Sequence, residues 1–580
     1  MKWLIFAIIF LLLPSMVLAD SGKIRLVTAV TDGEEVKAGN TPEMFLEVRP
    51  GNGNIYIDSL PLTRIDTQIS TRFANAVACD FLDTDCSQHD FFYKLRTGTN
   101  VIGGPSAGAG ITVLTVAVLD NQQIRQDVVM TGTINSGGLV GPVGGLREKA
   151  LASHNEGLVK LLVPSLALGN KTSIENISEN LSIDIMPVSN LEEALFEFTG
   201  KDYSKELPEL EVPEFYTKTM TEVADKLCNR FDQIMEKEEL GHYEDENNSL
   251  YNSAVDFFNR SVVANEEGDQ YARASYCFSG SLRLRELDLN ELSQEELLEG
   301  FHGINNRLNL LDEKVDSKKF NTMSDLETYM IVKERVAEAR DVLGEINSSN
   351  ISSSSLAYAF ERLYSGVFWS DFFDKPGNEF NLENEQLRDS CFEKIEEAKE
   401  RIDYLSVTFS APTERLSEDL SLAHLYFDNQ DYGLCLFKAS KVKADADMIL
   451  TVLFVDVDQT DKLLDEKIVQ TEKVIRSELA KGQFPILGYS YYEYALSLQD
   501  RDPYSSLIYL EYAMELSNLD MYFPPKKSFR FVFPDISYIF GFIFGIIVGG
   551  IIVILIQKNQ VKIRKNPRRP PKGNLPGKKR

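Results

Sequence analysis

The sequence predicts an α+β or α/β domain followed by a longer, almost entirely helical region. Between residues 23 and 200, segments rich in β-branched and apolar residues alternate with segments of helical periodicity. Between residues 215 and 522 the helical pattern continues almost throughout. An acidic stretch over 201–214, punctuated by Pro208 and Pro213, separates the two parts and is interpreted as a linker.

The first domain is expected to contain strands and helices in mixed order. Strands are expected over residues 24–30, 44–48, 55–57, 128–134, 158–163 and 183–188. Helices are expected over residues 69–81, 107–119, 148–156 and 191–198. The helix over 107–119 consists almost wholly of small and apolar residues, so we expect it to be buried. A domain of this size is long enough to enclose a core of its own.

The helical region contains small and aromatic residues at helical spacing, most clearly over 423–439 and 489–513. This spacing resembles tetratricopeptide-type helix pairs. An irregular helical bundle explains it equally well, because aromatic stripes at helical spacing usually form core. Our hypothesis is that the region captures substrates or partners and spaces the first domain from a membrane.

The two ends of the chain predict export and anchoring. An apolar run over 3–13 and small residues up to Ala19 predict a signal peptide over 1–19, with an uncleaved anchor as the alternative. Residues 536–556 contain no charged side chain and are long enough to cross a hydrocarbon core of about 30 Å, so they predict a transmembrane helix. The basic tail over 558–580 favours a cytoplasmic C-terminus, which places the catalytic domain outside the cell on a single-pass membrane protein.

Charge and cysteine usage exclude some classes of protein. A net charge of −28 disfavours nucleic acid as a partner. The six cysteines are an even number in a chain that is predicted to be exported. Sequential pairing is one of several connectivities, and six buried free thiols are the alternative. That pairing would join Cys79 to Cys86, Cys228 to Cys277 and Cys391 to Cys435. The absence of a Cys-x-x-Cys or His-rich pattern predicts no metal site.

Ser106 lies in a glycine-rich segment and is a candidate nucleophile. Pro105 fixes its own φ, and Ser106 is a good N-cap for a helix that begins at Ala107. The hydroxyl would then lie where free backbone N–H groups converge and bind a developing oxyanion. Gly104, Ala107 and Gly108 leave room for a substrate backbone. A plain capped helix start is the alternative interpretation.

Lys149 follows the second glycine-rich turn, Gly144-Gly145, and is a candidate base. A lysine acts as a base only when it is neutral, so its pKa has to fall from about 10.4 toward about 7–8. Burial and a helix N-terminus both lower it. Arg147 is excluded, because guanidinium does not lose its proton in proteins. The pair predicts a peptidase that needs no histidine, metal or cofactor.

Residues 51–200 resemble the proteolytic domain of Lon proteases. The motifs that carry the resemblance lie at 104–108, 127–132, 144–152, 161–164 and 183–188. The resemblance implies that Ser106 is the nucleophile, that Lys149 is the general base, and that Thr131 hydrogen-bonds the lysine and helps to hold it neutral. It also implies protein or peptide substrates and a tendency to form rings. Gly541, Gly545 and Gly549 recur at every fourth residue in the predicted span and would let helices approach closely, which favours self-association.

Two departures from the family matter. Gly103 stands where many relatives carry an acidic residue, which puts acid-assisted gating of the pair in doubt. The chain has no Gly-x-x-x-x-Gly-Lys-Ser/Thr loop, so no ATPase module is expected. It therefore resembles a secreted, membrane-tethered and ATP-independent relative of the kind found in archaea.

Two other functions fit parts of the sequence. Gly104-x-Ser106-x-Gly108 also matches the nucleophile elbow of α/β-hydrolases, which would need a histidine such as His154. His154 lies in the segment that already matches the lysine motif, so we interpret it as structural. The second alternative is a non-catalytic helical scaffold on a dead protease fold, against which the intact Ser106 and Lys149 argue.

Overall fold

The computed structural model describes most of the chain. The described residues are 20–32, 35–60, 64–97, 104–165, 177–178, 180–239, 249–345, 351–380, 382–409, 411–453, 460–523 and 536–564. The predicted signal peptide over 1–19 and the tail beyond residue 564 lie outside them.

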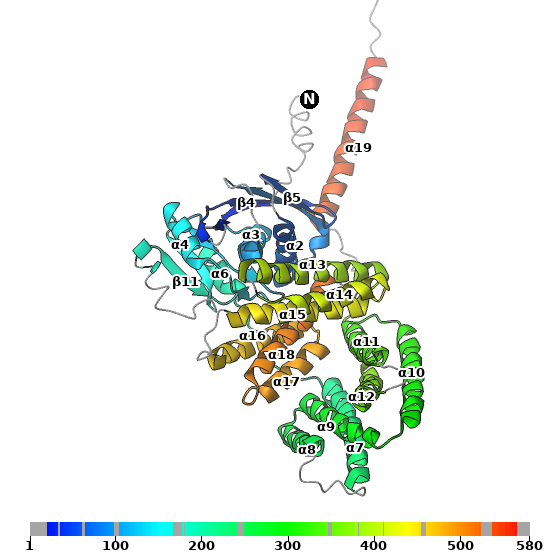
Figure 1. The fold of residues 1–580 in the computed structure, drawn as a ribbon. Coiled ribbons are helices and arrows are strands. Elements are labelled where there is room, and N and C mark those ends of the chain that lie inside the picture. The colour runs from blue at the N-terminus through cyan, green and yellow to red at the C-terminus, as the bar shows by residue number, and fades with distance from the viewer. Residues whose placement is uncertain are drawn as a thin grey trace, which may run out of the picture. The chain divides into compact units, whose positions relative to one another are not determined.

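The first domain is built on a four-stranded sheet. Its strands, in spatial order, are β1 (Asp20–Arg25), β4 (Glu43–Pro50), β6 (His89–Arg96) and β5 (Ile55–Leu60). β4 is antiparallel to β1 and β6, whereas β5 runs parallel to β6. One face packs on α2 (Ile65–Phe81) and α3 (Gly108–Leu119), as Figure 1 shows. Alternate residues of β4 are buried, as expected for a strand with one covered face.

A second, three-stranded sheet carries part of the site. It contains β11 (Asp184–Val188), β10 (Lys160–Pro164) and β7 (Val128–Met130), all parallel. β7 is fully buried, which is typical of parallel strands covered on both faces. A bridge between Leu26 and Met130 joins the two sheets. The remaining elements are β2 (Ala29–Asp32), β3 (Glu35–Ala38), β8 (Thr133–Ile134), β9 (Val140–Gly141), α4 (Leu146–Asn155) and α6 (Leu191–Thr199).

Three parts of the prediction for this domain need correction. The strand predicted over 128–134 is interrupted at residues 131–132, which separate β7 from β8. The pattern does not predict β6, because its charged residues Asp90, Lys94 and Arg96 interrupt the apolar run. The strand predicted over 24–30 is also wrong in its extent. The chain pairs with β4 only as far as Arg25 and then begins β2.

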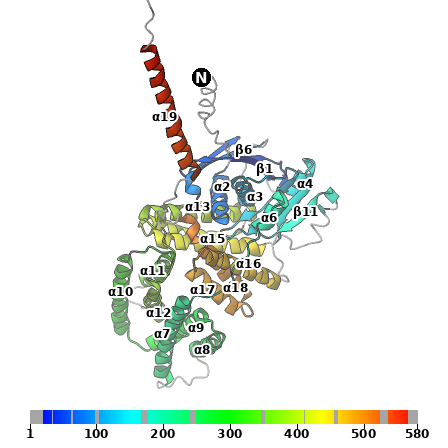
Figure 2. The ribbon, with the colours of Figure 1, turned by 180° about the vertical axis from the view of Figure 1, so that it is seen from behind.

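The helical region begins at α7, after residues 201–213, which have no regular structure. Its described helices have these bounds: α7 (Glu214–Glu239), α8 (Ser249–Glu267), α9 (Gln270–Asn290), α10 (Gln294–Asp316), α11 (Met323–Gly344), α12 (Ser353–Trp369), α13 (Asn384–Phe409), α14 (Glu414–Asp428), α15 (Tyr432–Leu453), α16 (Thr460–Ala480), α17 (Ile486–Leu498) and α18 (Pro503–Ser517). Neighbours in the chain, such as α8 and α9 or α17 and α18, pack side by side. In Figures 1 and 2, α13 and α15 lie between the first domain and the other helices.

The cysteines form the three disulfides of the sequential pairing. Cys79 is joined to Cys86, Cys228 to Cys277, and Cys391 to Cys435. The second disulfide links α7 to α9 and the third links α13 to α15.

The last described helix, α19 (Ile536–Arg564), belongs to a separate unit over 526–580. Among the described residues, no helix combines the length and the apolar composition that crossing a membrane requires. The span predicted over 536–556 falls partly on residues 536–543, whose side chains lie outside the described set. The span therefore stays a prediction from the sequence.

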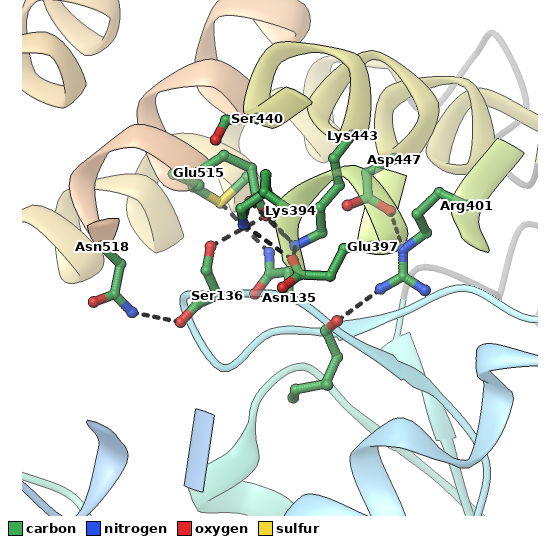
Figure 3. A network of polar contacts seen from close by, with 12 residues as sticks. Asn135, Ser136, Lys394, Glu397, Arg401, Ser440, Lys443, Asp447, Glu515 and Asn518 are labelled. Carbon is green, nitrogen blue, oxygen red and sulfur yellow. Dashed lines mark hydrogen bonds and ion pairs between the residues drawn. The ribbon is translucent and has the colours of Figure 1, made fainter. Parts of the chain in front are cut away.

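A buried charge network joins the first domain to the helical region (Figure 3). The Ser136 hydroxyl, on the loop between β8 and β9, donates to the Glu515 carboxylate at 3.1 Å. Glu515 also forms ion pairs with Lys394 at 3.1 Å and Lys443 at 2.9 Å, and all four residues are buried. Burial alone would raise the pKa of Glu515, but the two ammonium groups outweigh it and lower the pKa to about 2.

Replacing Glu515 with glutamine should destabilise the folded chain. The substitution keeps the size of the side chain but leaves Lys394 and Lys443 with Glu397 as their remaining carboxylate. Breaking a buried ion pair in this way costs about 3–5 kcal/mol. Urea unfolding at pH 7 measures the effect. The control is Glu466→Gln, which removes an exposed pair with Lys462 and should change the free energy of unfolding by less than about 1 kcal/mol. Equal effects of the two substitutions would contradict the prediction.

Candidate catalytic site

Ser106 lies in a short 3-10 turn, η2 (Pro105–Ala107), that leads directly into α3. Gly104, just before this turn, has φ +101°, a backbone conformation that favours glycine. Its N–H donates to the Asp66 carboxylate at 2.9 Å, so α2 holds the entrance of the turn.

The expectation that Ser106 caps the helix is wrong. The helix does not begin at Ala107, because Pro105, Ser106 and Ala107 first form the 3-10 turn. No side chain caps either η2 or α3. The Ser106 hydroxyl therefore has no capping role that would compete with nucleophilic attack.

The backbone of Ser106 is fixed by the chain that follows β7. Its carbonyl accepts from the Gly132 N–H at 2.9 Å and from the Thr131 hydroxyl at 3.3 Å. The Ala109 N–H in turn donates to the Gly132 carbonyl at 3.1 Å. These three hydrogen bonds tie the turn that carries the serine to the end of a buried strand.

Lys149 lies in the first turn of α4, and its side chain is buried. Gly145, with φ +70°, precedes this helix, and its carbonyl accepts from the Lys149 N–H at 2.9 Å. The residue is only 3% exposed, and its Nζ donates to the Thr131 hydroxyl at 3.0 Å. Burial lowers the pKa of Lys149 to about 7. A substantial fraction of the amine is therefore neutral at neutral pH.

Thr131 connects the two candidate residues. Its hydroxyl accepts from the Lys149 amine and donates to the Ser106 carbonyl. Ser106 and Lys149 are both described, and the structure contains no direct hydrogen bond between their side chains. The amine nevertheless lies one hydroxyl group away from the serine backbone, in a setting that excludes bulk water.

Two residues at the site were not expected from the sequence. Asp66 binds the Gly104 N–H, as described above. Tyr404, from α13, accepts a hydrogen bond from the Gly144 N–H at 3.1 Å, and its ring lies 3.8 Å from the position that a Cβ on Gly104 would take. The sequence around Tyr404 carries no signal of this contact, because the pattern there is that of an ordinary buried helix.

His154, the histidine considered for a hydrolase, is exposed on α4, whereas Lys149 on the same helix is buried. Within the described part of the chain, no group of three or more His, Cys, Asp or Glu side chains is arranged to hold a metal ion. The described site brings a buried amine with a lowered pKa and the backbone of the candidate serine to the same threonine hydroxyl.

Comparison with known proteins identifies the family of the first domain. Residues 67–198 match the Lon protease (S16) C-terminal proteolytic domain. This range contains Ser106, Thr131 and Lys149 and ends before the helical region. The resemblance predicted from the motifs is confirmed.

Individual relatives match over similar parts of the chain. The Lon protease of Escherichia coli is 38% identical over 110 residues, which are 19% of this chain and 14% of that protein. The Lon protease of Fervidobacterium nodosum is 28% identical over 199 residues, 33% of this chain and 24% of that protein. The Lon protease of Methanosarcina barkeri is 28% identical over 230 residues, 35% and 27% respectively. The chain thus spans less than a third of the length of these relatives.

The burial of Lys149 predicts a pH-dependent effect of Lys149→Met. The folded-state pKa of about 7 lies below the ordinary value of 10.5, so the unfolded chain binds the proton more tightly. Wild-type stability should therefore rise between pH 7 and pH 10.5. Methionine carries no proton, so the variant should gain up to about 4 kcal/mol over wild type at pH 7, at about 1.36 kcal/mol per pKa unit, and this gain should shrink as the pH rises.

Urea unfolding of both proteins at pH 7 and pH 9.5 measures the change in this gain. Lys160→Met is the matched control, because Lys160 pairs with Glu197 at 2.8 Å and that bond raises its pKa. Lys160→Met should not show an increase in the free energy of unfolding over wild type that becomes smaller as the pH rises. A pH-independent effect of Lys149→Met would mean that the amine is charged in the folded protein.

Proposed function

Because the chain carries a Lon-type serine peptidase domain, we propose that it is an endopeptidase in which Ser106 is the nucleophile and Lys149 the general base. The observation that carries the proposal is the buried Lys149 amine, bound to the Thr131 hydroxyl. Thr131 also donates to the Ser106 backbone carbonyl, so a single threonine links the proposed base to the backbone of the proposed nucleophile.

The reaction is acyl transfer in two steps. Neutral Lys149 takes the proton of the Ser106 hydroxyl while Oγ attacks the peptide carbonyl carbon. The resulting ammonium group gives this proton to the leaving amine, and the C–N bond breaks to form an acyl-enzyme. Lys149 then takes a proton from a water molecule while the water oxygen attacks the ester carbon. The C–Oγ bond breaks, the carboxylic acid product leaves, and the ammonium group returns the proton to the Ser106 oxygen.

The oxyanion needs backbone donors near Ser106. The Gly104 N–H already donates to Asp66, and Pro105 has no N–H. The Gly108 N–H donates to the Pro105 carbonyl. The amides of Ser106 and Ala107 are therefore the donors that we propose for the oxyanion. For Gly104 the proposed supporting role is the one expected from the sequence, which is to leave room for a substrate backbone.

We also propose that the reaction needs no nucleotide. The sequence has no phosphate-binding loop of the Gly-x-x-x-x-Gly-Lys-Ser/Thr type. The substrates would then be proteins or peptides that reach the site without ATP-driven unfolding. This part of the proposal rests on the sequence.

Labelling of Ser106 tests the assignment. Purified protein without nucleotide should react with a peptidyl phosphonate probe at Ser106, and Ser106→Ala should abolish the reaction. Peptidase kcat/KM should rise through about pH 7 as Lys149 loses its proton. Lys149→Arg should lower kcat/KM by about 100-fold or more, because an arginine base stays charged and general-base catalysis is lost.

Lys160→Ala is the control for removing a lysine from the same domain and should keep most of the activity. An unlabelled Ser106 in folded wild-type protein would favour the non-catalytic scaffold. Full activity of Lys149→Arg together with loss of activity in His154→Ala would favour the hydrolase.

We propose, from the sequence alone, that the protein is a single-pass membrane protein with its catalytic domain outside the cell. The support is the uncharged stretch over 536–556 and the basic tail over 558–580. The charge asymmetry favours a cytoplasmic tail.

Truncation tests this localisation. The full chain should stay in the membrane fraction after carbonate washing, and its catalytic domain should be digested by protease added to intact cells. A chain that ends at residue 525 should be released. Recovery of both forms in the soluble fraction would refute the anchor.

A further inference from the structure

Helix α13 of the helical region lies against the segments that form the catalytic site. The Tyr404 hydroxyl accepts from the Gly144 N–H at 3.1 Å. The ring of the same residue lies 3.8 Å from the position that a Cβ on Gly104 would take. One side chain therefore binds the glycine turn before Lys149 and lies close to the glycine turn before Ser106.

The contact with Gly144 bears on where the Lys149 amine lies. Gly144 and Gly145 form the turn from which α4 starts, and the Lys149 N–H donates to the Gly145 carbonyl at 2.9 Å. A displacement of this turn would displace the first turn of α4. The Lys149 side chain would then lose its position beside Thr131.

Arg401, one helical turn before Tyr404, holds a third segment of the site. It donates to the Ile134 carbonyl at 2.8 Å and pairs with Asp447 at 2.8 Å (Figure 3). Ile134 in turn packs against Gly108, at the start of α3. The same face of α13 thus contacts the serine turn, the lysine turn and the strand that follows Thr131.

Tyr404 is suited to a fixed contact. It is 9% exposed, and burial raises its pKa, although the Gly144 N–H and the charge of Arg401 oppose this effect. The phenol stays protonated over the pH range in which Lys149 titrates. A change in activity across that range therefore does not come from Tyr404 itself.

We propose that Tyr404 is a positioning residue of the catalytic site, which holds the turn before Lys149 against the turn before Ser106. The helical region then completes the site in addition to any role in substrate capture. This inference rests on the proposed function for the identity of the base.

The test uses the full chain with Tyr404→Phe, which keeps the ring and removes the hydrogen-bond acceptor. The matched control is Tyr512→Phe, because the Tyr512 hydroxyl donates to Asp445 at 2.6 Å within the helical region. Peptide hydrolysis is measured from pH 5.5 to pH 9.5. Loosening of the Gly144 turn should admit water to the Lys149 amine and raise its pKa.

For Tyr404→Phe we expect kcat at pH 7 to fall about 5- to 10-fold, with KM within about twofold, and the acidic limb of the profile to move up by about 0.5–1 pH unit. The control variant, Tyr512→Phe, should keep the acidic limb of its pH–activity profile at the wild-type pH, even if its melting temperature falls. If the acidic limb of the pH–activity profile of Tyr404→Phe stayed at the wild-type pH, the proposal would be overturned. A rise in activity would also overturn it, because it would mean that Tyr404 obstructs the site.

A second readout separates this inference from the proposed function. Reductive methylation of Lys149 across the same pH range, followed by mass spectrometry in the Ser106→Ala background, follows the lysine proton without turnover. If the pH at which Lys149 becomes reactive toward methylation is higher in Tyr404→Phe but not in Tyr512→Phe, the positioning role is supported. If the phosphonate probe did not label Ser106 in the wild-type protein, the proposed peptidase function would be refuted. The pH dependence of Lys149 methylation would still show whether Tyr404 positions the lysine.

Discussion

A lysine amine is a base only while it is uncharged, and the protein keeps the amine of Lys149 in this form by burying it against the Thr131 hydroxyl. Much of the surrounding backbone holds the Lys149 side chain in this buried position. α4 starts from a glycine with positive φ, and β7 ends so that Thr131 lies between the amine and Ser106. A water-filled gap at any of these contacts would return the pKa of the amine toward its ordinary value.

The helical region is attached to the first domain through buried charges rather than through an apolar surface alone. Glu515, Lys394 and Lys443 lie between Ser136 on one side and the packed helices on the other. Buried ion pairs add little net stability compared with apolar packing, but a misplaced partner leaves a charge unpaired at high cost. The network therefore favours one docked arrangement, and in that arrangement α13 reaches the site.

The sequence predicted the parts of the structure that depend on local patterns. Glycine turns before Ser106 and Lys149 and the strands with β-branched residues were recognisable because their causes lie within a few residues. The capping role of Ser106 was predicted wrongly because Pro105 and Gly104 favour a 3-10 turn before the helix starts. β6 was missed because three of its side chains are charged and face away from the core.

The contact between Tyr404 and Gly144 lay beyond any sequence pattern. The two residues are 260 positions apart, and the periodicity of α13 indicates only that one face is buried. Which domain that face meets depends on the docking of two separately patterned regions. The sequential disulfides were predictable for the opposite reason, since the cysteines lie on elements that are close in the chain as well as in space.

The disulfide between Cys391 and Cys435 ties α13, which bears Tyr404, to α15. Thiols stay reduced in most cytosols and oxidise in secretory compartments. Chains produced in a reducing cytosol would lack this covalent link, and their helix beside the site would be held by packing, ion pairs and hydrogen bonds. The choice of expression host thus determines whether a purified sample carries the covalent link between these two helices.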